Sequence, residues 1–253
     1  AAPPPPLHLL GGGAAEEAPH APLKMDARRA GALDVLVKLV RVIGNLAISP
    51  EAATQLVASR LLAGTFLALL SEHSVDDSEE LVLNVVSTIS NLTFYEGAKD
   101  NHILLGRRVL VGCLSPLLLC GQEDAVAEAA RCFGNLSRYA DVRQEMAARR
   151  VDAALCILLD HSNSAVLYSA AGVLMNIAAD EAHRDELSQH DNVGRVVDAL
   201  AHALYGGEAS LAVILLKALF NLCAADAAKS RRAVLTPAQA AVARDAIADY
   251  LST

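Results

Sequence analysis

Five asparagines recur along the chain at a nearly constant interval. They are spaced 46, 44, 41 and 45 residues apart, at Asn45, Asn91, Asn135, Asn176 and Asn221. An asparagine amide donates and accepts hydrogen bonds without a charge having to be buried, so a row of amides suits binding to the backbone of an extended polypeptide. The same amide can instead bond a neighbouring segment of its own chain and be purely structural. The sequence alone leaves both uses open.

The residue types that perform catalysis lack a suitable spacing. The eight histidines form no H-E-x-x-H pattern and no Cys/His ligand pattern, so we interpret them as turn or surface residues. Gly11, Gly12 and Gly13 precede no P-loop lysine, which removes a phosphate-binding loop. We therefore predict that the protein is not an enzyme and has no catalytic, cofactor-binding or metal site, no cofactor and no small-molecule substrate.

The composition predicts a folded, acidic protein. The chain has 253 residues, of which 53% are hydrophobic and only 4% aromatic, so a large core of aliphatic and alanine side chains is expected. The net charge is -8, and no strong run of Lys and Arg is present. Binding to nucleic acid or to an acidic membrane needs clustered positive charge, so neither partner is expected.

The cysteines and apolar runs indicate a reducing compartment without membrane insertion. The most apolar run, residues 103–119, is interrupted by Arg107, Arg108 and Pro116, and falls short of the roughly 20 residues of a membrane span. Prolines and glycines break the apolar patch near the start, so no secretion signal is expected. The cysteines are odd in number and lack a C-x-x-C pair, and we expect all of them to be reduced core residues: Cys113, Cys120, Cys132, Cys156 and Cys223. A cytoplasmic location is therefore predicted.

Each asparagine lies in a segment with helical periodicity and an apolar opposite face. A helix places the residues nine, six, five and two positions before the asparagine on that face, and all twenty are apolar. In the first segment these residues are Leu36, Leu39, Val40 and Ile43. We expect one continuous buried face on each asparagine helix, as stacked repeats require.

Two further helical patterns separate successive asparagine helices. A short polar pattern comes first and a very apolar one second, at 51–59 and 61–70, at 141–146 and 151–159, and at 183–189 and 193–204. Turn-forming residues precede the next asparagine helix, at 76–78, 121–124, 162–164 and 206–208. The segment 107–120 fits least well, because Pro116 predicts a helix start or a kink. Each repeat is therefore expected to contain three helices.

The expected domain organisation has three parts. Residues 1–24, rich in Pro, Gly and Ala, are predicted to be a flexible tail or linker, 25–235 the repeats, and 236–253 a capping helix that begins at Thr236 and Pro237. The first repeat lacks its polar helix. Either the tail covers that end or the chain is part of something longer, and we favour the second because an uncapped stack exposes apolar surface.

A three-helix unit of roughly 42 residues with asparagine and leucine late in its third helix resembles the armadillo repeat. The likeness covers residues 33–225 in five registers. It implies an all-α fold, a right-handed armadillo-repeat solenoid of about five repeats. In such a stack the third helices line a concave groove, so the resemblance places the asparagines there.

The groove expected from this resemblance contains the asparagines, polar residues one and two turns before them, and two tyrosines one turn after. Four of these residues are basic, which favours an extended acidic segment as the ligand. Structural bonding alone, or binding on the convex face, is the alternative. The expected groove residues are Lys38, Arg41, Asn45, Asn84, Ser87, Asn91, Tyr95, Glu128, Arg131, Asn135, Tyr139, Asn176, Lys217 and Asn221.

Segments 39–48, 83–95 and 131–137 resemble axonemal armadillo proteins of motile cilia and flagella. The resemblance implies a protein-binding adaptor in axoneme assembly, with radial spoke or intraflagellar transport components as partners and a place in the ciliary axoneme. The alternative is a cytosolic or nuclear adaptor of the catenin or importin class that binds an extended acidic peptide. Import receptors carry tryptophan one turn before the asparagine, whereas this chain has none, which disfavours cargo import.

Two asparagines also begin a glycosylation triplet, at 91–93 and 135–137. Both triplets lie in predicted packed helices of a chain for which no export signal is expected. We interpret both as accidental.

Overall fold

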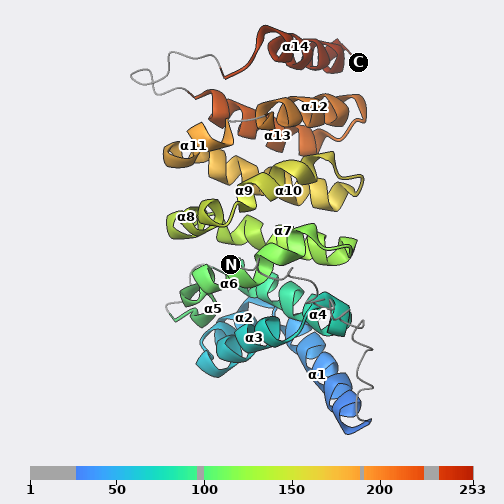
Figure 1. Cartoon of the computed structure of the whole chain (residues 1–253), viewed down its shortest axis with the longest axis vertical. Helices are drawn as coiled ribbons and strands as arrows, with labels where there is room; N and C mark the ends of the chain where they lie inside the picture. Colours follow the sequence, from blue (N-terminus) through green and yellow to red (C-terminus); the bar gives the residue numbers. More distant parts are fainter. Residues whose placement is uncertain (1–26, 96–99, 189–190, 225–233, 253) are drawn as a thin grey trace, which may run out of the picture.

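The computed structural model describes residues 27–95, 100–188, 191–224 and 234–252, and every regular element in these ranges is a helix. The helices are stacked in chain order, with α1 at one end and α14 at the other (Figure 1). The predicted all-α repeat solenoid is confirmed. The tail predicted for residues 1–24 lies outside the described residues.

The three predicted kinds of helix are present in the stack. The asparagine helices are α1 (Ala27–Leu46), α4 (Val75–Thr93), α7 (Glu123–Leu136), α10 (Ser164–Ala179) and α13 (Ala209–Cys223). The first helices are α2 (Pro50–Val57), α5 (His102–Leu105), α8 (Ala140–Ala148) and α11 (Glu181–Leu187). The second helices are α3 (Arg60–Glu72), α6 (Arg107–Leu114), α9 (Val151–Ile157) and α12 (Asn192–Tyr205). The short 3₁₀ helices η1 (Ser115–Leu119) and η2 (Leu158–Asp160) extend α6 and α9, and α14 (Pro237–Ser252) packs against α12.

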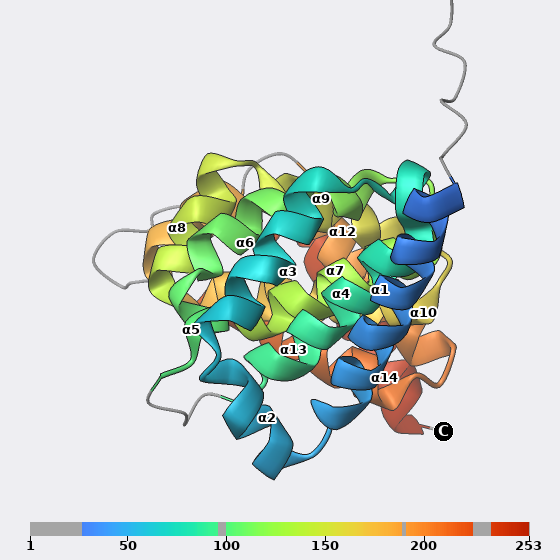
Figure 2. The same ribbon diagram turned by 90° about the horizontal axis from the view of Figure 1, so that it is seen from below.

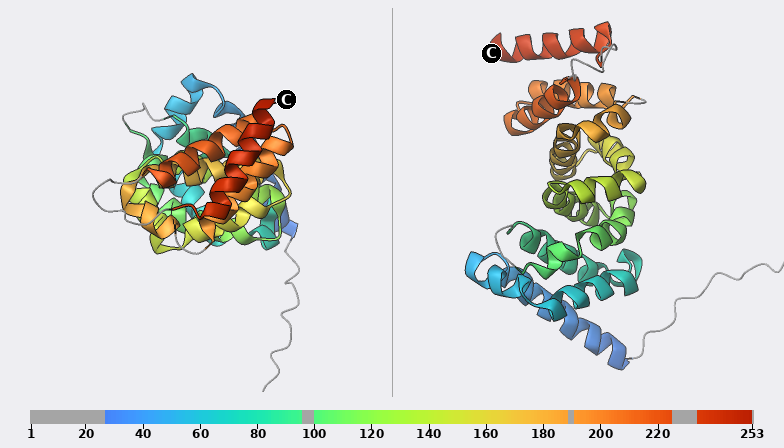
Figure 3. Two further views of the ribbon diagram at one scale, coloured as in Figure 1. Left: turned by 90° about the horizontal axis from the view of Figure 1, so that it is seen from above. Right: turned by 90° about the vertical axis from the view of Figure 1, so that its left-hand side faces the viewer.

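Successive asparagine helices pack directly against one another, from α1 and α4 through to α10 and α13. Viewed from the α1 end, α1, α4 and α10 lie toward the right of the stack, and α5 and α8 lie toward the left (Figure 2). Figure 3 shows the stack from above and from the side. This arrangement places the asparagines in a single row along one surface.

The predicted buried face is present in all asparagine helices except at one residue of α1. The twenty predicted positions are buried or half-buried apart from Leu39, which is 55% exposed. The prediction for Leu39 is wrong because no described helix packs against that side of α1. The equivalent Val85 of α4 is 0% exposed, since α1 and α4 pack together.

Polar caps and special backbone residues set the helix ends. The side chains of Ser59, Asn163 and Asp180 accept hydrogen bonds from backbone N–H groups in the first turns of α3, α10 and α11. Gly207, with φ of +72°, lies in the predicted turn after α12, where a side chain would strain the backbone. The predicted break at Pro116 falls inside η1. The predicted turn at 76–78 is instead a single helical turn that Ser78 interrupts at φ -155°.

The cysteines divide into buried and exposed thiols, and all five are free. Cys132 and Cys156 are core residues as predicted, and burial raises the pKa of each thiol to about 12. Cys113 and Cys120 are half-buried. The prediction is wrong for Cys223, which is exposed because it ends α13 beyond the residues that pack inside the stack.

In the part of the chain that the structure describes, no single helix is long and apolar enough to cross a membrane; the bent pair Pro50–Val57 and Arg60–Glu72 meets that test by length and composition alone.

Two phenylalanines provide a matched test of the core. Phe133 of α7 is 0% exposed, whereas Phe220 of α13 is 74% exposed. We expect Phe133→Ala to lower the free energy of unfolding by about 3–5 kcal/mol, because it leaves a cavity in a packed interior. Phe220→Ala is expected to change it by less than about 0.5 kcal/mol. Urea denaturation followed by circular dichroism measures both, and equal losses would contradict the assigned core.

Candidate protein-binding groove

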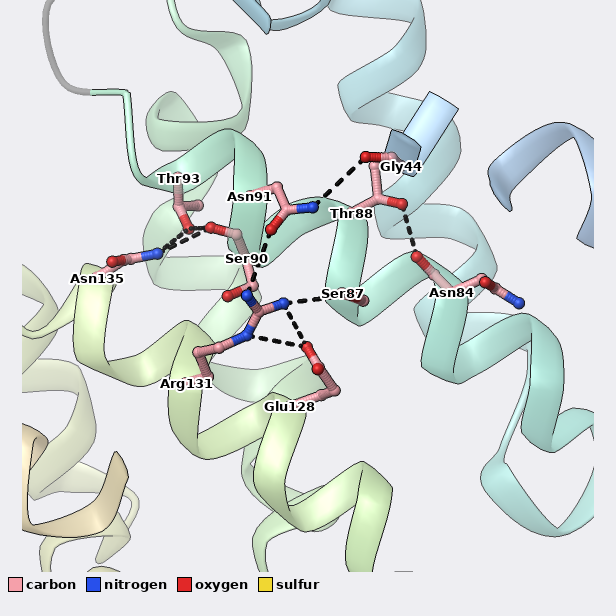
Figure 4. Close-up of polar contacts among 10 residues, drawn as sticks. All are labelled: Gly44, Asn84, Ser87, Thr88, Ser90, Asn91, Thr93, Glu128, Arg131 and Asn135. Carbon is pink, nitrogen blue, oxygen red and sulfur yellow. Dashed lines mark hydrogen bonds and ion pairs between the residues drawn. The ribbon is translucent and has the colours of Figure 1, made fainter. Parts of the chain in front are cut away.

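A row of hydrogen bonds, which we call the asparagine ladder, joins each repeat to the one before it. Each of the four later asparagines donates its Nδ2 to the carbonyl of the residue that precedes the previous asparagine. The N···O distances are 3.4 Å from Asn91 to Gly44, 2.8 Å from Asn135 to Ser90, 3.3 Å from Asn176 to Gly134 and 3.1 Å from Asn221 to Met175. Figure 4 shows the first two steps. At each of these four contacts between repeats, the asparagine therefore has a structural role.

Two buried hydroxyl groups strengthen the middle of the ladder. The Asn135 Nδ2 also donates to Thr93 Oγ1 at 3.3 Å, and the Asn176 Nδ2 donates to Ser137 Oγ at 2.9 Å. Thr93 and Ser137 are both 0% exposed. Thr93 and Ser137 are the third residues of the two glycosylation triplets. A hydroxyl two residues after one asparagine was therefore the sequence signal that the asparagine of the following repeat has a second acceptor.

The ladder uses only part of each amide. A primary amide has two N–H donors and an oxygen with two lone pairs, whereas stacking engages one nitrogen. The Oδ1 of Asn91 accepts from Arg131 Nη1 at 3.4 Å. The Oδ1 atoms of Asn176 and Asn221 accept no hydrogen bond from the other described residues. The structural and the ligand-binding uses of these two amides are therefore compatible.

Three of the four basic groove residues are paired within the chain. Lys38 forms an ion pair with Asp34 at 2.7 Å, and Arg41 forms one with Glu80. Arg131 pairs with Glu128 at 2.7 Å and also donates to Ser87 Oγ at 3.2 Å (Figure 4). These are exposed or partly exposed pairs, worth about 0–1 kcal/mol each, but they lower the local positive charge. The α1-to-α7 part of the groove is thus less basic than its residue types indicate.

Both predicted groove tyrosines and Asn84 are also bonded within the chain. The Tyr95 hydroxyl donates to the Ile48 carbonyl at 2.8 Å, which connects the first two repeats. The Tyr139 ring lies beneath the Arg107 guanidinium, 4.9 Å from the ring centroid. Asn84 Nδ2 donates to the Glu80 carbonyl at 2.6 Å.

The groove residues between α10 and α13 have fewer partners in the described chain. A hollow of about 370 Å³ lies there, and its lining combines apolar, amide and ammonium groups: Met175, Asn176, Ala179, Leu216, Lys217, Phe220 and Asn221. Lys217 is exposed and forms no ion pair with another described residue. The Phe220 side chain is 74% exposed although it is strongly apolar. Exposed aromatic surface beside unpaired polar groups is typical of a protein-binding site.

Arginines on the edge of the stack form a second set of links that sequence reasoning missed. Arg143 donates to the Ser137 carbonyl at 2.8 Å and to Asp180 of the next repeat at 2.8 Å. Arg184 donates to the carbonyls of Ala178 and Ala224, both at 2.7 Å. Each arginine lies eight residues after a ladder asparagine, and this repeated spacing was the available signal. The guanidinium groups satisfy carbonyls at the helix ends.

The Arg143 link also affects a carboxyl group. Burial by itself would raise the pKa of Asp180, but the Arg143 guanidinium and the Ala182 N–H outweigh it, so the pKa of that carboxyl lies below its ordinary value. The carboxylate is therefore stabilised by the folded structure. Of the described residues, no group of three or more His, Cys, Asp and Glu side chains is placed to hold a metal ion.

Stacked three-helix repeats joined by an asparagine ladder define an armadillo-repeat solenoid. A computationally designed armadillo repeat protein for modular peptide recognition has the same fold, with a TM-score of 0.58 and 22% identity over 76% of this chain and 82% of that one. A designed armadillo repeat protein solved with the peptide (KR)4 gives a TM-score of 0.54 and 16% identity over 87% and 98% of the two chains.

The chain belongs to the armadillo-repeat proteins, and its curated relatives are armadillo repeat-containing protein 2 of three mammals. The Bos taurus protein is 38% identical over 177 residues, which is 69% of this chain and 20% of that protein. The Homo sapiens protein is 36% identical over 189 residues, and the Mus musculus protein 34% over 208, or 22% and 24% of their lengths. The matched part is thus less than a quarter of each relative. No family model matches the chain.

A comparison of two asparagines tests the ladder. Asn135→Ala removes two hydrogen bonds, one to the carbonyl of the buried Ser90 and one to the hydroxyl of the buried Thr93, so we expect a loss of about 1–3 kcal/mol in the free energy of unfolding. Asn45 is exposed and its side-chain amide forms no hydrogen bond with another described residue, so Asn45→Ala is expected to cost less than about 0.5 kcal/mol. Thermal and urea denaturation check both values. Equal costs would mean that the ladder does not stabilise the stack.

Asp180 predicts a pH dependence with a defined sign. A carboxyl whose pKa is lowered by folding stabilises the folded state above its unfolded pKa, and this stabilisation disappears as the pH falls through the folded pKa. Asp180→Asn should therefore destabilise the protein at pH 7 and have a smaller effect near pH 3. Asp245→Asn, at an ion pair with the exposed Arg244, serves as the control with a small effect. Denaturation midpoints from pH 3 to 7 measure the difference, and a pH-independent effect at Asp180 would contradict the assignment.

Proposed function

We propose that the protein is a non-enzymatic scaffold that binds an extended acidic segment of a partner protein in the groove between α10 and α13. The observation that carries this proposal is the hollow that joins the exposed Phe220 ring, Lys217, which forms no ion pair with another described residue, and two ladder asparagines. These groups supply apolar area, positive charge and backbone hydrogen bonding at one place. An extended polypeptide with acidic and apolar side chains requires all three.

Each group has a defined role in the proposed complex. The Oδ1 atoms of Asn176 and Asn221, which accept from no other described residue, accept from backbone N–H groups of the ligand, while their nitrogens stay in the ladder. The Lys217 ammonium pairs with a carboxylate, and the Phe220 ring covers the adjacent apolar side chain. The designed armadillo protein solved with (KR)4 supports the general ability of the fold to hold a peptide, although that peptide is basic.

The cellular role that we propose is assembly of the axoneme of motile cilia and flagella. The similarity to armadillo repeat-containing protein 2, at 34–38% identity, supports this role. The partners would be radial spoke components or the intraflagellar transport proteins that deliver them. The protein would then be located in the cytoplasm and in the ciliary axoneme.

Reversal of charge at two lysines tests the binding site. We expect Lys217→Glu to weaken binding of an eight-residue peptide of alternating acidic and apolar residues by at least about tenfold, because a like charge would face the peptide carboxylate. Lys38→Glu should change the affinity by less than about threefold, since Lys38 already pairs with Asp34. Fluorescence anisotropy with a labelled peptide measures both. Unchanged binding by Lys217→Glu, with an unaltered circular dichroism spectrum, would refute the site.

Localisation tests the cellular role separately from the groove. A tagged protein in multiciliated cells is expected at basal bodies and in axonemes, and co-purification from flagellar extracts should recover spoke or transport components. A protein confined to cell junctions or the nucleus would instead support the catenin or importin class of adaptor. That result would leave the peptide-binding measurement unaffected.

A further inference from the structure

The outward side of α1 carries an apolar stripe that no described helix covers. Four of its residues are 50–56% exposed and recur at helical spacing, so that they lie on one face. We call these residues the α1 outer face: Val35, Leu39, Val42 and Leu46. A stripe of this length is unusual on the surface of a folded domain.

The other repeats show what such a face does in this stack. The residues of the α1 outer face lie ten, six and three positions before the asparagine and one position after it. In every later asparagine helix, the residues at these four positions are at most 4% exposed. They are Leu81, Val85, Thr88 and Leu92 in α4; Ala125, Ala129, Cys132 and Leu136 in α7; Val166, Ala170, Val173 and Ile177 in α10; and Leu211, Leu215, Ala218 and Leu222 in α13. The α1 outer face is thus in register with a repeat interface whose other half is not among the described helices.

The asparagine ladder independently points to the same side of α1. Every later asparagine donates to a carbonyl of the preceding asparagine helix, which fixes the direction of the ladder. Asn45 is exposed, and its amide bonds no other described residue. In the later repeats, one neighbouring helix both covers the apolar stripe and accepts from the asparagine amide. For α1 that neighbour would be a helix that runs parallel to it and presents a free carbonyl near its end.

We propose that the α1 outer face is the docking site for the third helix of a further armadillo repeat, which the same polypeptide supplies on the N-terminal side of α1. The internal comparison defines the chemistry of this helix. It has an apolar face at the positions that Leu36, Val40 and Ile43 occupy in α1, and its carbonyl before the asparagine accepts from Asn45 Nδ2. The proposal concerns the end of the stack and does not depend on the groove.

Two observations favour this occupant over a second copy of the chain. Two α1 outer faces packed together would leave Asn45 without its acceptor, because the Gly44 carbonyl lies on the opposite side of α1 and already accepts from Asn91. Four half-exposed side chains are also few for an interface of the roughly 1,200–2,000 Å² that stable complexes bury. A helix on the same polypeptide needs less area, because its effective concentration is high. The curated relatives are four to five times longer than the matched part, which allows for further repeats.

Accessibility of a thiol at position 42 tests the proposal. Val42→Cys is labelled with iodoacetamide in the 253-residue chain and in the complete natural polypeptide, and peptide mass spectrometry resolves the rates from those of the native cysteines. Phe220→Cys, which is exposed in the groove, is the matched control. We expect labelling at position 42 to be at least tenfold slower in the complete polypeptide, with the rate at position 220 unchanged. Asn45→Ala should return part of the accessibility at position 42.

Each other result overturns the proposal. Equal rates at position 42 in the two proteins would mean that no repeat docks there. Protection that rises with concentration in the 253-residue chain would identify a second copy as the occupant. Protection in that chain at every concentration, lost when residues 1–24 are removed, would identify the chain's own N-terminal residues.

Discussion

The hydrogen bond from each asparagine to a carbonyl of the preceding repeat is the interaction on which this structure depends. It holds adjacent asparagine helices at one register, with N···O distances of 2.8 to 3.4 Å along the row. Gly44 shows how close that approach is, since a Cβ atom there would lie 2.7 Å from Thr88 Oγ1. Because the bond recurs once per repeat, the apolar faces beside it are brought into the same packing each time. A periodic stack follows from one short-range contact and its repetition.

The same bond determines what the groove can offer a ligand. It engages the amide nitrogen and leaves the amide oxygen of Asn176 and Asn221 unused by the described chain, so a residue that supports the stack also remains available for binding. Charge divides the groove further. Between α1 and α7 the basic side chains are paired with Asp34, Glu80 and Glu128, whereas Lys217 has no such partner among the described residues. We therefore place the proposed acidic ligand between α10 and α13.

Much of this fold was predictable from periodicity, because burial of a helix face depends on residue type at fixed spacing. The asparagine helices and the short polar and apolar helices between them followed from that spacing. Leu39 was predicted to be buried and is exposed, since periodicity identifies an apolar face without identifying the neighbour that covers it. The prediction for Cys223 failed for a similar reason, as it lies at a helix end where packing stops.

The candidate site was less predictable, because it depends on which side chains pair within the folded chain. The residue types of Lys38, Arg41 and Arg131 indicate a basic groove, but their carboxylate partners were not assigned. Lys38 and Arg131 pair with a carboxylate one turn away on the same helix, and Arg41 pairs with Glu80 on the next asparagine helix. Thr93 and Ser137 were interpreted only as parts of accidental triplets, although both hydroxyls accept hydrogen bonds from ladder amides. The contacts of Thr93 and Ser137 and those of Arg143 and Arg184 were missed, although each pair recurs at the period of the asparagines. That repetition was the available signal.

The central claim is that one ladder amide serves both the stack and the ligand, and side-chain amide NMR tests it most directly. The two Nδ2 protons of Asn176 and Asn221 are followed by hydrogen exchange and chemical shift while an acidic extended peptide is added. The account predicts that at least one proton of the Asn176 amide and one of the Asn221 amide are protected in the free protein and stay protected in the complex, while the amide resonances shift on binding. Loss of that protection on binding, or resonances that do not respond to the peptide, would contradict it.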